Sequence, residues 1–257
     1  MRIATWNVNS IRAREGRVRA WVERNQPDVL CLQELKAEDS GFPHALFEAL
    51  GYQVALIGQR SYNGVAIAAR GELTDVVRGF GDGGDDEQAR FIVATVAGGV
   101  RVASIYVPNG QALGSDKYAY KLEWYQRLRR WLDTHASTGA PLALCADWNV
   151  APADLDVHDP AKWAGQVHVS DPERAAWREV VAWGFTDCYR HVHPEGRAYS
   201  WWDYRGVAFF KDYGLRIDHI LASPPLAARL TACEIDRAER KGQDASDHAP
   251  VTATFSD

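Results

Sequence analysis

The chain has 257 residues, of which 46% are apolar and 25% are charged, and its formal net charge is −5. This apolar content is typical of a folded globular protein and excludes a disordered or low-complexity chain. The negative charge argues against a protein that coats nucleic acid, because affinity for a polyanion comes from lysine and arginine, but it is compatible with an enzyme that contacts one briefly.

Short apolar runs that suit β-strands are followed along the chain by stretches with helical periodicity. The strand-like runs span about 2–8, 29–35, 52–58, 64–70, 90–97, 100–107, 141–147, 199–203, 214–221, 230–235 and 250–255. The helix-like stretches lie near 11–24, 43–50, 116–136 and 172–183. About eleven strands are too many for one open sheet, so we predict an α/β fold in which two sheets pack face to face with helices outside.

Other features of the sequence bear on the domain organisation, on the state of the cysteines and on the cellular location of the protein. No linker divides the chain, so we expect a single domain over 1–257, with two similar halves that meet near residue 140. Segment 81–86 contains only glycine and aspartate and is predicted to be a surface loop. The four cysteines show no Cys-x-x-Cys pairing, which favours buried reduced thiols over zinc or disulfides. No signal-like segment opens the chain, so we expect a cytoplasmic location without membrane insertion.

Acidic, amide and imidazole side chains recur where the strand-like runs begin or end. They are Asn7, Asn9, Glu34, Asp147, Asn149, Asp218, Asp247 and His248. Each residue alone is more often a turn, a cap or an edge charge, so the prediction depends on the set. Carboxylates suit a hard divalent cation, and amides suit oxyanions. Together with one histidine, they are what metal-assisted attack of water on a phosphodiester requires.

Three of these residues can be given roles from their positions. Glu34 ends a run that should be a buried strand of parallel type, and sites collect at the carboxyl ends of such strands, so it is our first predicted metal ligand. Asp147 and Asn149 are two residues apart, so both should point the same way on an extended backbone. Asp147 suits the orientation and deprotonation of the attacking water, and Asn149 can donate to a phosphate oxygen.

His248 follows Asp247 at the mouth of the last strand-like run. A histidine on a polar turn is often merely solvated. With Asp218 available to hold one ring nitrogen, however, His248 becomes a candidate for contacting the scissile phosphate in its charged form. His219 should point to the opposite face of its strand and is left out of the site.

Six motifs carry a resemblance to a known family. In chain order they are Trp6-Asn7-Val8-Asn9, Leu32-Gln33-Glu34, Tyr106-Val107-Pro108-Asn109-Gly110, Ala146-Asp147-Trp148-Asn149, Leu215-Arg216-Ile217-Asp218 and Ser246-Asp247-His248-Ala249-Pro250. This set resembles the exodeoxyribonuclease III and abasic-site endonuclease family of the deoxyribonuclease-I-like endonuclease/exonuclease/phosphatase superfamily. The resemblance covers nearly the whole chain and implies a four-layer α/β sandwich with two mixed sheets.

The resemblance also implies a metal site. Glu34 resembles the Mg²⁺ ligand of the family, and Asn9 and Asp247 are expected near the metal. Mn²⁺ is an alternative cation for this site.

The resemblance implies roles around the phosphate as well. The residues expected to position and activate water are Asn7, Asp147 and Asn149. Tyr106 and Asn109 are expected to hold the phosphate. Asp218 and His248 resemble the supporting pair.

The segment Tyr199-Ser200-Trp201-Trp202-Asp203-Tyr204 is rich in aromatic residues. Rings that alternate along a strand are more often core residues. In the family, however, the positions of Trp201, Leu215 and Ile217 resemble an apolar pocket that receives a flipped-out abasic sugar. Arg205 and Lys211 lie just beyond Trp201 and are candidates for contacts with DNA phosphates.

Two residues depart from the family pattern. Ala146 stands where the family usually has glycine, a change that adds only a methyl group. His168 stands where many relatives carry a small residue close to the sugar pocket. It is either a simple loop histidine or an obstruction to an internal abasic nucleotide that still admits a frayed 3′ end.

We therefore predict a Mg²⁺-dependent DNA-repair phosphodiesterase that acts as a monomer on double-stranded DNA. It would incise abasic sites and process blocked 3′ ends as a 3′–5′ exonuclease, 3′-phosphodiesterase and 3′-phosphatase, leaving 3′-hydroxyl ends. One alternative is mainly 3′-end processing, with weak abasic incision because of His168. Others are a hydrolase of phospholipids or inositol phosphates, and a non-catalytic nucleic-acid-binding regulator. Such a regulator would be expected to have lost Glu34, Asp147 or His248.

Overall fold

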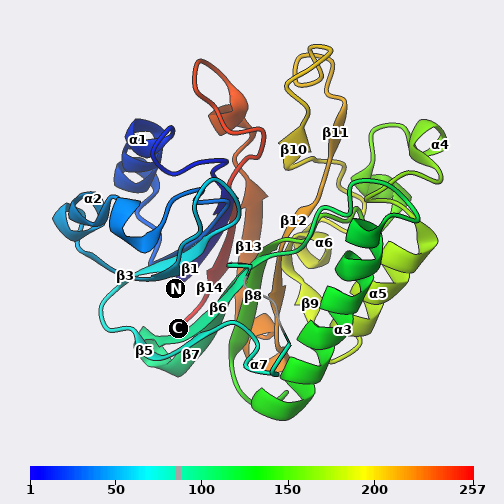
Figure 1. The fold of residues 1–257 in the computed structure, drawn as a ribbon. Helices are drawn as coiled ribbons and strands as arrows, with labels where there is room; N and C mark the ends of the chain where they lie inside the picture. The colour runs from blue at the N-terminus through cyan, green and yellow to red at the C-terminus, as the bar shows by residue number, and fades with distance from the viewer. Residues whose placement is uncertain (85–87) are drawn as a thin grey trace.

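The computed structural model describes residues 1–84 and 88–257. Two six-stranded sheets lie face to face, with helices on the two outer faces of the pair (Figure 1). Each large sheet combines parallel and antiparallel neighbours. The predicted α/β sandwich of two packed mixed sheets flanked by helices is confirmed.

The first sheet has the strand order β13-β14-β1-β2-β4-β3. Its strands are β1 (Arg2–Asn7), β2 (Val29–Gln33), β3 (Tyr52–Ile57), β4 (Val65–Arg70), β13 (Leu230–Ile235) and β14 (Val251–Phe255). Helix α1 (Glu15–Asn25) crosses over between β1 and β2, which run parallel for that reason. The other neighbours in this sheet are antiparallel, and helix α2 (His44–Ala49) precedes the edge strand β3.

The second sheet repeats this plan with the order β5-β6-β7-β8-β12-β9. Its strands are β5 (Thr74–Arg78), β6 (Phe91–Val96), β7 (Val100–Tyr106), β8 (Leu142–Asp147), β9 (Thr186–Asp187) and β12 (Asp218–Ala222). Helix α3 (Asp116–His135) connects β7 to its parallel neighbour β8, and α5 (Asp171–Val181) lies beside α3. Each large sheet therefore contains strands from both sides of residue 140.

The core lies in three layers between the four layers of structure. Aliphatic side chains from both sheets fill the space between them, among them Ile3, Val29, Ile67, Ile92, Val102 and Ile220. On the outer faces, Trp21 and Phe47 help to cover the first sheet, and Trp124 and Trp131 help to cover the second. The central strands of each sheet are buried on both faces, which explains why they appear in the sequence as continuous apolar runs.

The short elements are those that the sequence analysis missed or misplaced. They are β5, β9, α4 (Pro160–Trp163), α6 (Cys188–Val192), α7 (Pro224–Ala227) and the 3₁₀ turns Asp39–Gly41, Ala97–Gly99, Asp154–Asp156 and Arg237–Arg240. The predicted strands 199–203 and 214–221 pair only as β10 (Trp201–Trp202) and β11 (Gly214–Leu215), and β12 begins separately at Asp218. The break arises because the backbone N–H of Arg216 donates to a loop carbonyl and that of Ile217 to the Ser200 hydroxyl.

The structure also shows where the predicted helices begin and how they are capped. The helix expected at 11–24 begins at Glu15, after a turn. Helix α3 is capped by Ser115, whose Oγ accepts from the N–H of Tyr118 at 3.2 Å, and Asp116 is the first helical residue. Helix α5 begins with a capping box formed by Ser170 and Glu173.

Three composition-based expectations can be compared with the structure. In the predicted loop 81–86, Asp82 pairs with Arg127 of α3 at 2.8 Å, and Asp85 and Asp86 lie outside the described residues. The four cysteines are free and buried, as predicted. No helix in the described part of the chain combines the length and apolar content needed to cross a membrane.

Candidate active site

The predicted polar residues meet at the edge of the sandwich that is uppermost in Figure 1. Asn7 and Asp147 end β1 and β8, and Glu34 follows β2 directly. Asp218 begins β12 directly opposite Asp147 in the strand register. His248 lies just before β14, the antiparallel neighbour of β1. Strand register therefore brings together residues that are far apart in the sequence.

The amide of Asn7 joins the two central carboxylates. Its Nδ2 donates to Glu34 Oε1 at 2.8 Å and to Asp147 Oδ2 at 2.9 Å. Its Oδ1 accepts from the backbone N–H of Asn9 at 3.0 Å, which fixes the orientation of the amide. Because Asn7 is fully buried, this bridge is shielded from competing water. The two carboxylates are therefore held close together.

Asp147 is buried, and burial raises the pKa of its carboxyl group to about 7. Its Oδ1 accepts from the backbone N–H of Asn149 at 3.0 Å. We predicted an extended backbone at Asn149, and this is wrong, because the φ of Asn149 is +51°. A tight turn after β8, rather than strand alternation, places it beside Asp147. The Nδ2 of Asn149 donates to the carbonyl of Val107 at 2.9 Å.

His248 is held by the predicted partner. Its Nδ1 lies 2.8 Å from Asp218 Oδ2, and its Nε2 lies 3.7 Å from Asp147 Oδ2. Burial alone would lower the pKa of His248, but the carboxylates of Asp218 and Asp147 outweigh it and raise the pKa to about 10. Ser200 donates to Asp218 Oδ2 at 2.6 Å and fixes that carboxylate in turn. The imidazole is therefore charged at neutral pH and faces Asp147.

The cluster contains donors that suit a hard cation. Ligand atoms of Glu34, Asp147 and His248 lie within 4.8 Å of one another. A charged imidazole has no free lone pair, so the carboxylate oxygens of Glu34 and Asp147 are the donors that fit Mg²⁺. The ammonium of Lys36 lies 2.8 Å from Glu34 Oε2 and 2.5 Å from Asn9 Oδ1, so these two oxygens already share a cation.

The other predicted metal neighbour, Asp247, is linked to this cluster through Asn9. Its Oδ1 accepts from Asn9 Nδ2 at 2.9 Å, and its Oδ2 accepts from Trp201 Nε1 at 3.0 Å. Asp247 is not a member of the group whose ligand atoms lie within 4.8 Å. The structure therefore places Asp247 at the side of the cluster that faces the aromatic segment.

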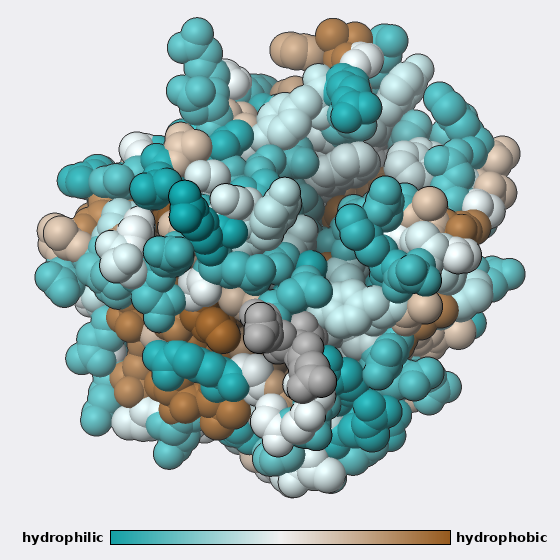
Figure 2. All heavy atoms as spheres, in the orientation of Figure 1, coloured by the Kyte–Doolittle hydropathy of each residue, from teal (hydrophilic) through white to brown (hydrophobic). Residues whose placement is uncertain are grey.

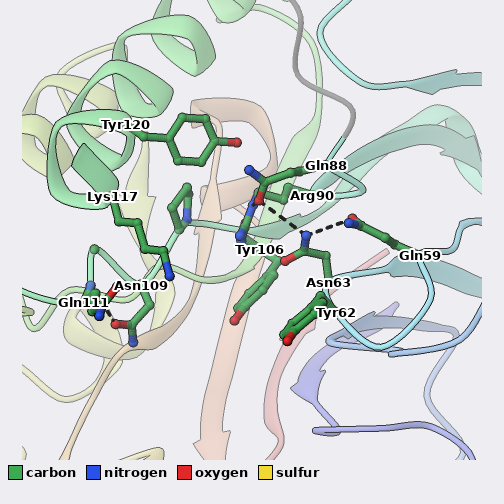
Figure 3. Close-up of a pocket in the computed structure, with 12 residues that line it drawn as sticks. Gln59, Tyr62, Asn63, Gln88, Arg90, Tyr106, Asn109, Gln111, Lys117 and Tyr120 are labelled. Atoms are coloured by element: carbon green, nitrogen blue, oxygen red, sulfur yellow. Dashed lines mark hydrogen bonds between the residues drawn. The ribbon is translucent and has the colours of Figure 1, made fainter. Parts of the chain in front are cut away.

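Tyr106 and Asn109 line a hollow of about 450 Å³ next to the cluster (Figure 3). Burial raises the pKa of Tyr106 well above its usual value, and the Glu34 carboxylate adds to the effect. The guanidinium of Arg90 lies 4.7 Å from the Tyr106 ring centroid, and the side chain of Lys117 extends into the hollow in Figure 3. The hollow therefore offers cations beside the predicted phosphate-holding residues.

The predicted sugar-pocket residues lie together. Trp201 pairs with Leu215 across β10 and β11, and Leu215 and Ile217 are buried in one small apolar cluster, against which Trp201 packs. The ring of His168 lies 6.5 Å from that of Trp163 and 6.4 Å from that of Trp201, measured between centroids. The imidazole of His168 therefore lies near both indoles.

Hydrogen bonds fix the His168 ring in this place. Its Nδ1 lies 2.7 Å from the carbonyl oxygen of Asn149, and its Nε2 lies 3.5 Å from Asn109 Nδ2. Burial, together with the nearby charge of Lys121, lowers the pKa of His168 to about 4. The ring is therefore neutral at pH 7, and Nδ1 must be the protonated nitrogen because a carbonyl can only accept.

Arg205 and Lys211 are placed differently from the buried cluster. Both are exposed on the segment 203–213, which projects between β10 and β11 (Figure 1). The same segment carries the exposed side chains Val207 and Phe210, and hydrophobic atoms are visible at its tip in Figure 2. The projection is therefore a basic and apolar surface beside the site rather than part of its centre.

Several residues that the sequence analysis did not single out complete the site. They are Arg14, Lys36, Arg90, Lys117, Lys121 and Ser200. Lys36 lies two residues after Glu34, just beyond the motif Leu32-Gln33-Glu34. Ala146, which departs from the expected family pattern, is fully buried in β8.

Comparison with known proteins adds independent observations. A family described as Endonuclease/Exonuclease/phosphatase matches residues 4–248. Exodeoxyribonuclease III of Haemophilus influenzae is 35% identical over 266 residues, covering 99% of this chain and 100% of that protein. An AP endonuclease structure from Archaeoglobus fulgidus is 41% identical with a TM-score of 0.96, covering 99% of each chain. The 3′ phosphatase NExo from Neisseria, bound to a product DNA hairpin, is 44% identical with a TM-score of 0.95, covering 100% of this chain and 99% of that one.

Proposed function

The chain belongs to the Endonuclease/Exonuclease/phosphatase family, and from this membership we propose that it is a DNA-repair phosphodiesterase that hydrolyses its substrate by metal-assisted attack of water. The observation that carries the proposal is the buried Asn7 amide, which joins Glu34 and Asp147 while the charged His248 faces Asp147. This arrangement provides a base, a cation site and an oxyanion partner around one point.

The proposed chemistry assigns one task to each group. Asp147 accepts a proton from water, whose oxygen bonds to phosphorus, while the bond between phosphorus and the 3′ oxygen breaks. That oxygen takes up a proton from solvent and leaves as a 3′-hydroxyl. Asn149 and Asn7 orient the water and Asp147, and His248 offsets the negative charge of the phosphate. Mg²⁺, or Mn²⁺ as an alternative, would be held by the Glu34 carboxylate with Asn9 and Asp247 nearby, and would neutralise phosphate charge.

The proposed substrate is double-stranded DNA with abasic sites or blocked 3′ ends. Tyr106 and Asn109 would hold the scissile phosphate, and the hollow beside them would bind the adjoining DNA strand. The cations Arg90 and Lys117, which line this hollow, support the assignment (Figure 3). Arg205 on the projecting segment would meet a phosphate further along. We further propose that the chain acts as a single domain and a monomer in the cytoplasm.

A second candidate function is supported by His168. Its ring lies near both Trp163 and Trp201, beside the pocket that Trp201 forms with Leu215 and Ile217 and that an abasic sugar would enter. Under this alternative, the protein mainly processes 3′ ends and incises internal abasic sites weakly. A terminal nucleotide can fray and bend away from the ring, whereas an internal one cannot.

The His168→Gly variant should raise the ratio of internal abasic incision to 3′-phosphate removal by about tenfold, because it removes a steric obstacle to one substrate only. Glycine is suited to the position, since His168 has a φ of +76°. The ratio is measured with two labelled duplexes in one reaction series. An unchanged ratio in a variant that keeps its melting temperature would contradict the obstruction.

The Glu34→Gln variant should require about 10- to 100-fold more Mg²⁺ for half-maximal activity, because it removes one carboxylate charge from the cation site. Chelation with EDTA should abolish activity in the wild type. Glu179→Gln is the matched control, because the side chain of Glu179 is 77% exposed on α5. An unchanged Mg²⁺ requirement in Glu34→Gln would remove Glu34 from the metal site.

The proposed function is tested by comparing substrate classes. The protein is incubated with Mg²⁺ and four substrates: duplexes with an internal abasic analogue, a 3′-phosphate or no lesion, and a phosphoinositide vesicle. We expect 3′-hydroxyl products from at least one damaged duplex and none from the vesicle. Hydrolysis of the lipid alone would support the phospholipid alternative, and DNA binding without hydrolysis would support the non-catalytic regulator.

A further inference from the structure

A fully buried ion pair lies behind the active site and has no role in the chemistry proposed above. Lys121 of α3 and Glu173 of α5 have side chains that are 0% exposed, and Nζ lies 2.5 Å from Oε1. Burying two charges is costly unless each is paired and hydrogen-bonded. The partners of this pair therefore indicate what it contributes.

Lys121 holds two segments that carry predicted site residues. Its Nζ donates to the carbonyl of Asn149 at 2.6 Å and to that of Asn109 at 3.1 Å, in addition to Glu173. An ammonium group has three protons, and all three are used. One side chain therefore links the segment that follows β7 to the segment that follows β8.

Glu173 holds a third segment. Its Oε1 also accepts from the backbone N–H of His168 at 3.0 Å, and its Oε2 accepts from the hydroxyl and N–H of Ser170 at 2.5 and 3.2 Å. The same carboxylate thus completes the capping box of α5 and fixes the backbone of the residue whose ring lies in the sugar pocket.

The segments held by the pair contain residues in the left-handed backbone region. Asn149 has a φ of +51° and His168 a φ of +76°, a conformation that non-glycine residues adopt only where surrounding contacts enforce it. Gly110, next to Asn109, has a φ of +92°, and a Cβ there would lie 3.1 Å from Lys121 Cδ. Lys121 and Glu173 supply the contacts that hold these backbones in place.

We propose that the buried Lys121–Glu173 ion pair is a positioning element that sets the orientation of Asn109, Asn149 and His168 together, and so controls both turnover and the choice between terminal and internal substrates. The inference rests on the proposed function. Neither residue touches the substrate, and both act through the three segments that they join.

The test uses the double variant Lys121→Met/Glu173→Gln in the full chain. Each single variant leaves a buried charge without a partner and should unfold easily, whereas removal of both charges is often neutral for stability. Methionine and glutamine preserve side-chain length but cannot hold the carbonyl oxygens of Asn109 and Asn149 as Lys121 does. We expect a melting temperature within a few degrees of the wild type, together with a kcat on a 3′-phosphate duplex that is lower on the order of 100-fold.

The matched control is Arg129→Met/Asp133→Asn, which removes an exposed ion pair from the same helix, with 3.1 Å between Nε and Oδ1. It should leave kcat within about threefold of the wild type, because exposed pairs contribute little. A normal kcat in the buried-pair variant, with normal stability, would overturn the positioning role while leaving the proposed function intact.

A double-mutant cycle that combines the buried-pair variant with Asn149→Ala distinguishes positioning of Asn149 from a general loosening of the structure. If the pair acts on turnover through Asn149, its removal should lower kcat by less than about threefold in the Asn149→Ala background, because the two changes share one effect. An equal loss in both backgrounds would contradict the proposal.

A spectroscopic measurement does not depend on activity. The backbone amide resonances of Asn109, Asn149 and His168 should shift in the buried-pair variant and stay unchanged in the control. Unshifted resonances would overturn the inference even if the wild type proved inactive on DNA, an outcome that by itself would count only against the proposed function.

Discussion

Replacing Asp147 by asparagine is expected to lower kcat for DNA hydrolysis by about 10³-fold, because the variant loses the group that we propose takes the proton from water. Asparagine has the same shape and can keep the contact with the Asn149 backbone N–H, which is 3.0 Å long in the wild type. The affinity for DNA should therefore change little. Single-turnover kinetics at saturating enzyme measure the chemical step, and filter binding measures the affinity.

Asp75→Asn is the matched control for this substitution. Asp75 is exposed on β5, and its φ of +49° is one that asparagine also accepts. The control should hydrolyse DNA at the wild-type rate. A kcat in Asp147→Asn within tenfold of the wild type would remove Asp147 from the role of base.

Replacing Asp218 by asparagine should lower kcat/KM by about 100-fold, because His248 loses the carboxylate that orients and charges it. The pKa of His248 is raised to about 10 against the effect of burial, and Asp218 is the largest of the groups that raise it. The wild type should therefore stay active as the pH rises until about 10, where the imidazole loses its proton. In the variant this loss should begin at a lower pH.

The two pH profiles of kcat/KM, recorded between pH 6 and 11, give the comparison. Ser200 bonds to the same carboxylate at 2.6 Å, and Ser200→Ala keeps the Asp218 charge, so its descending limb should lie much closer to that of the wild type than the limb of Asp218→Asn does. Identical profiles for the wild type and Asp218→Asn would contradict a charged His248 as a working part of the site.

The long elements of the fold were predictable because they lie in the core. Strands such as β1, β2 and β8 are buried on both faces, so each appears in the sequence as one apolar run. β5 was missed because it is an edge strand with mostly exposed residues, and β9 because it has two residues. Short elements carry too few residues for a period to be visible.

The polar cluster was predictable for a related reason. Residues at the ends of neighbouring strands must lie close together once the strands pair, and β8 and β12 place Asp147 opposite Asp218. The turn at Asn149 was not predictable from strand geometry, because a left-handed residue ends the alternation of side chains. The proximity we expected is present, but it has a different local cause.

The supporting residues were harder to identify from sequence. Lys121 lies on the buried stripe of α3 with Tyr125 and Leu128. Its partner Glu173 lies in another helix, 52 positions away. A charged residue on the apolar side of a helix was the available signal, and only the packing of α3 against α5 identifies its partner.

The convergence of Glu34, Asp147 and His248 on one phosphate is tested most directly by the single-turnover rates of Glu34→Gln, Asp147→Asn, His248→Gln and the triple variant on one 3′-phosphate duplex. Groups that act as a unit lose activity non-additively. We predict that each single variant is slower by about 100-fold or more and that the triple variant is little slower than the slowest single one. Losses that multiply across the three sites, or a triple variant as fast as the wild type, would contradict the account.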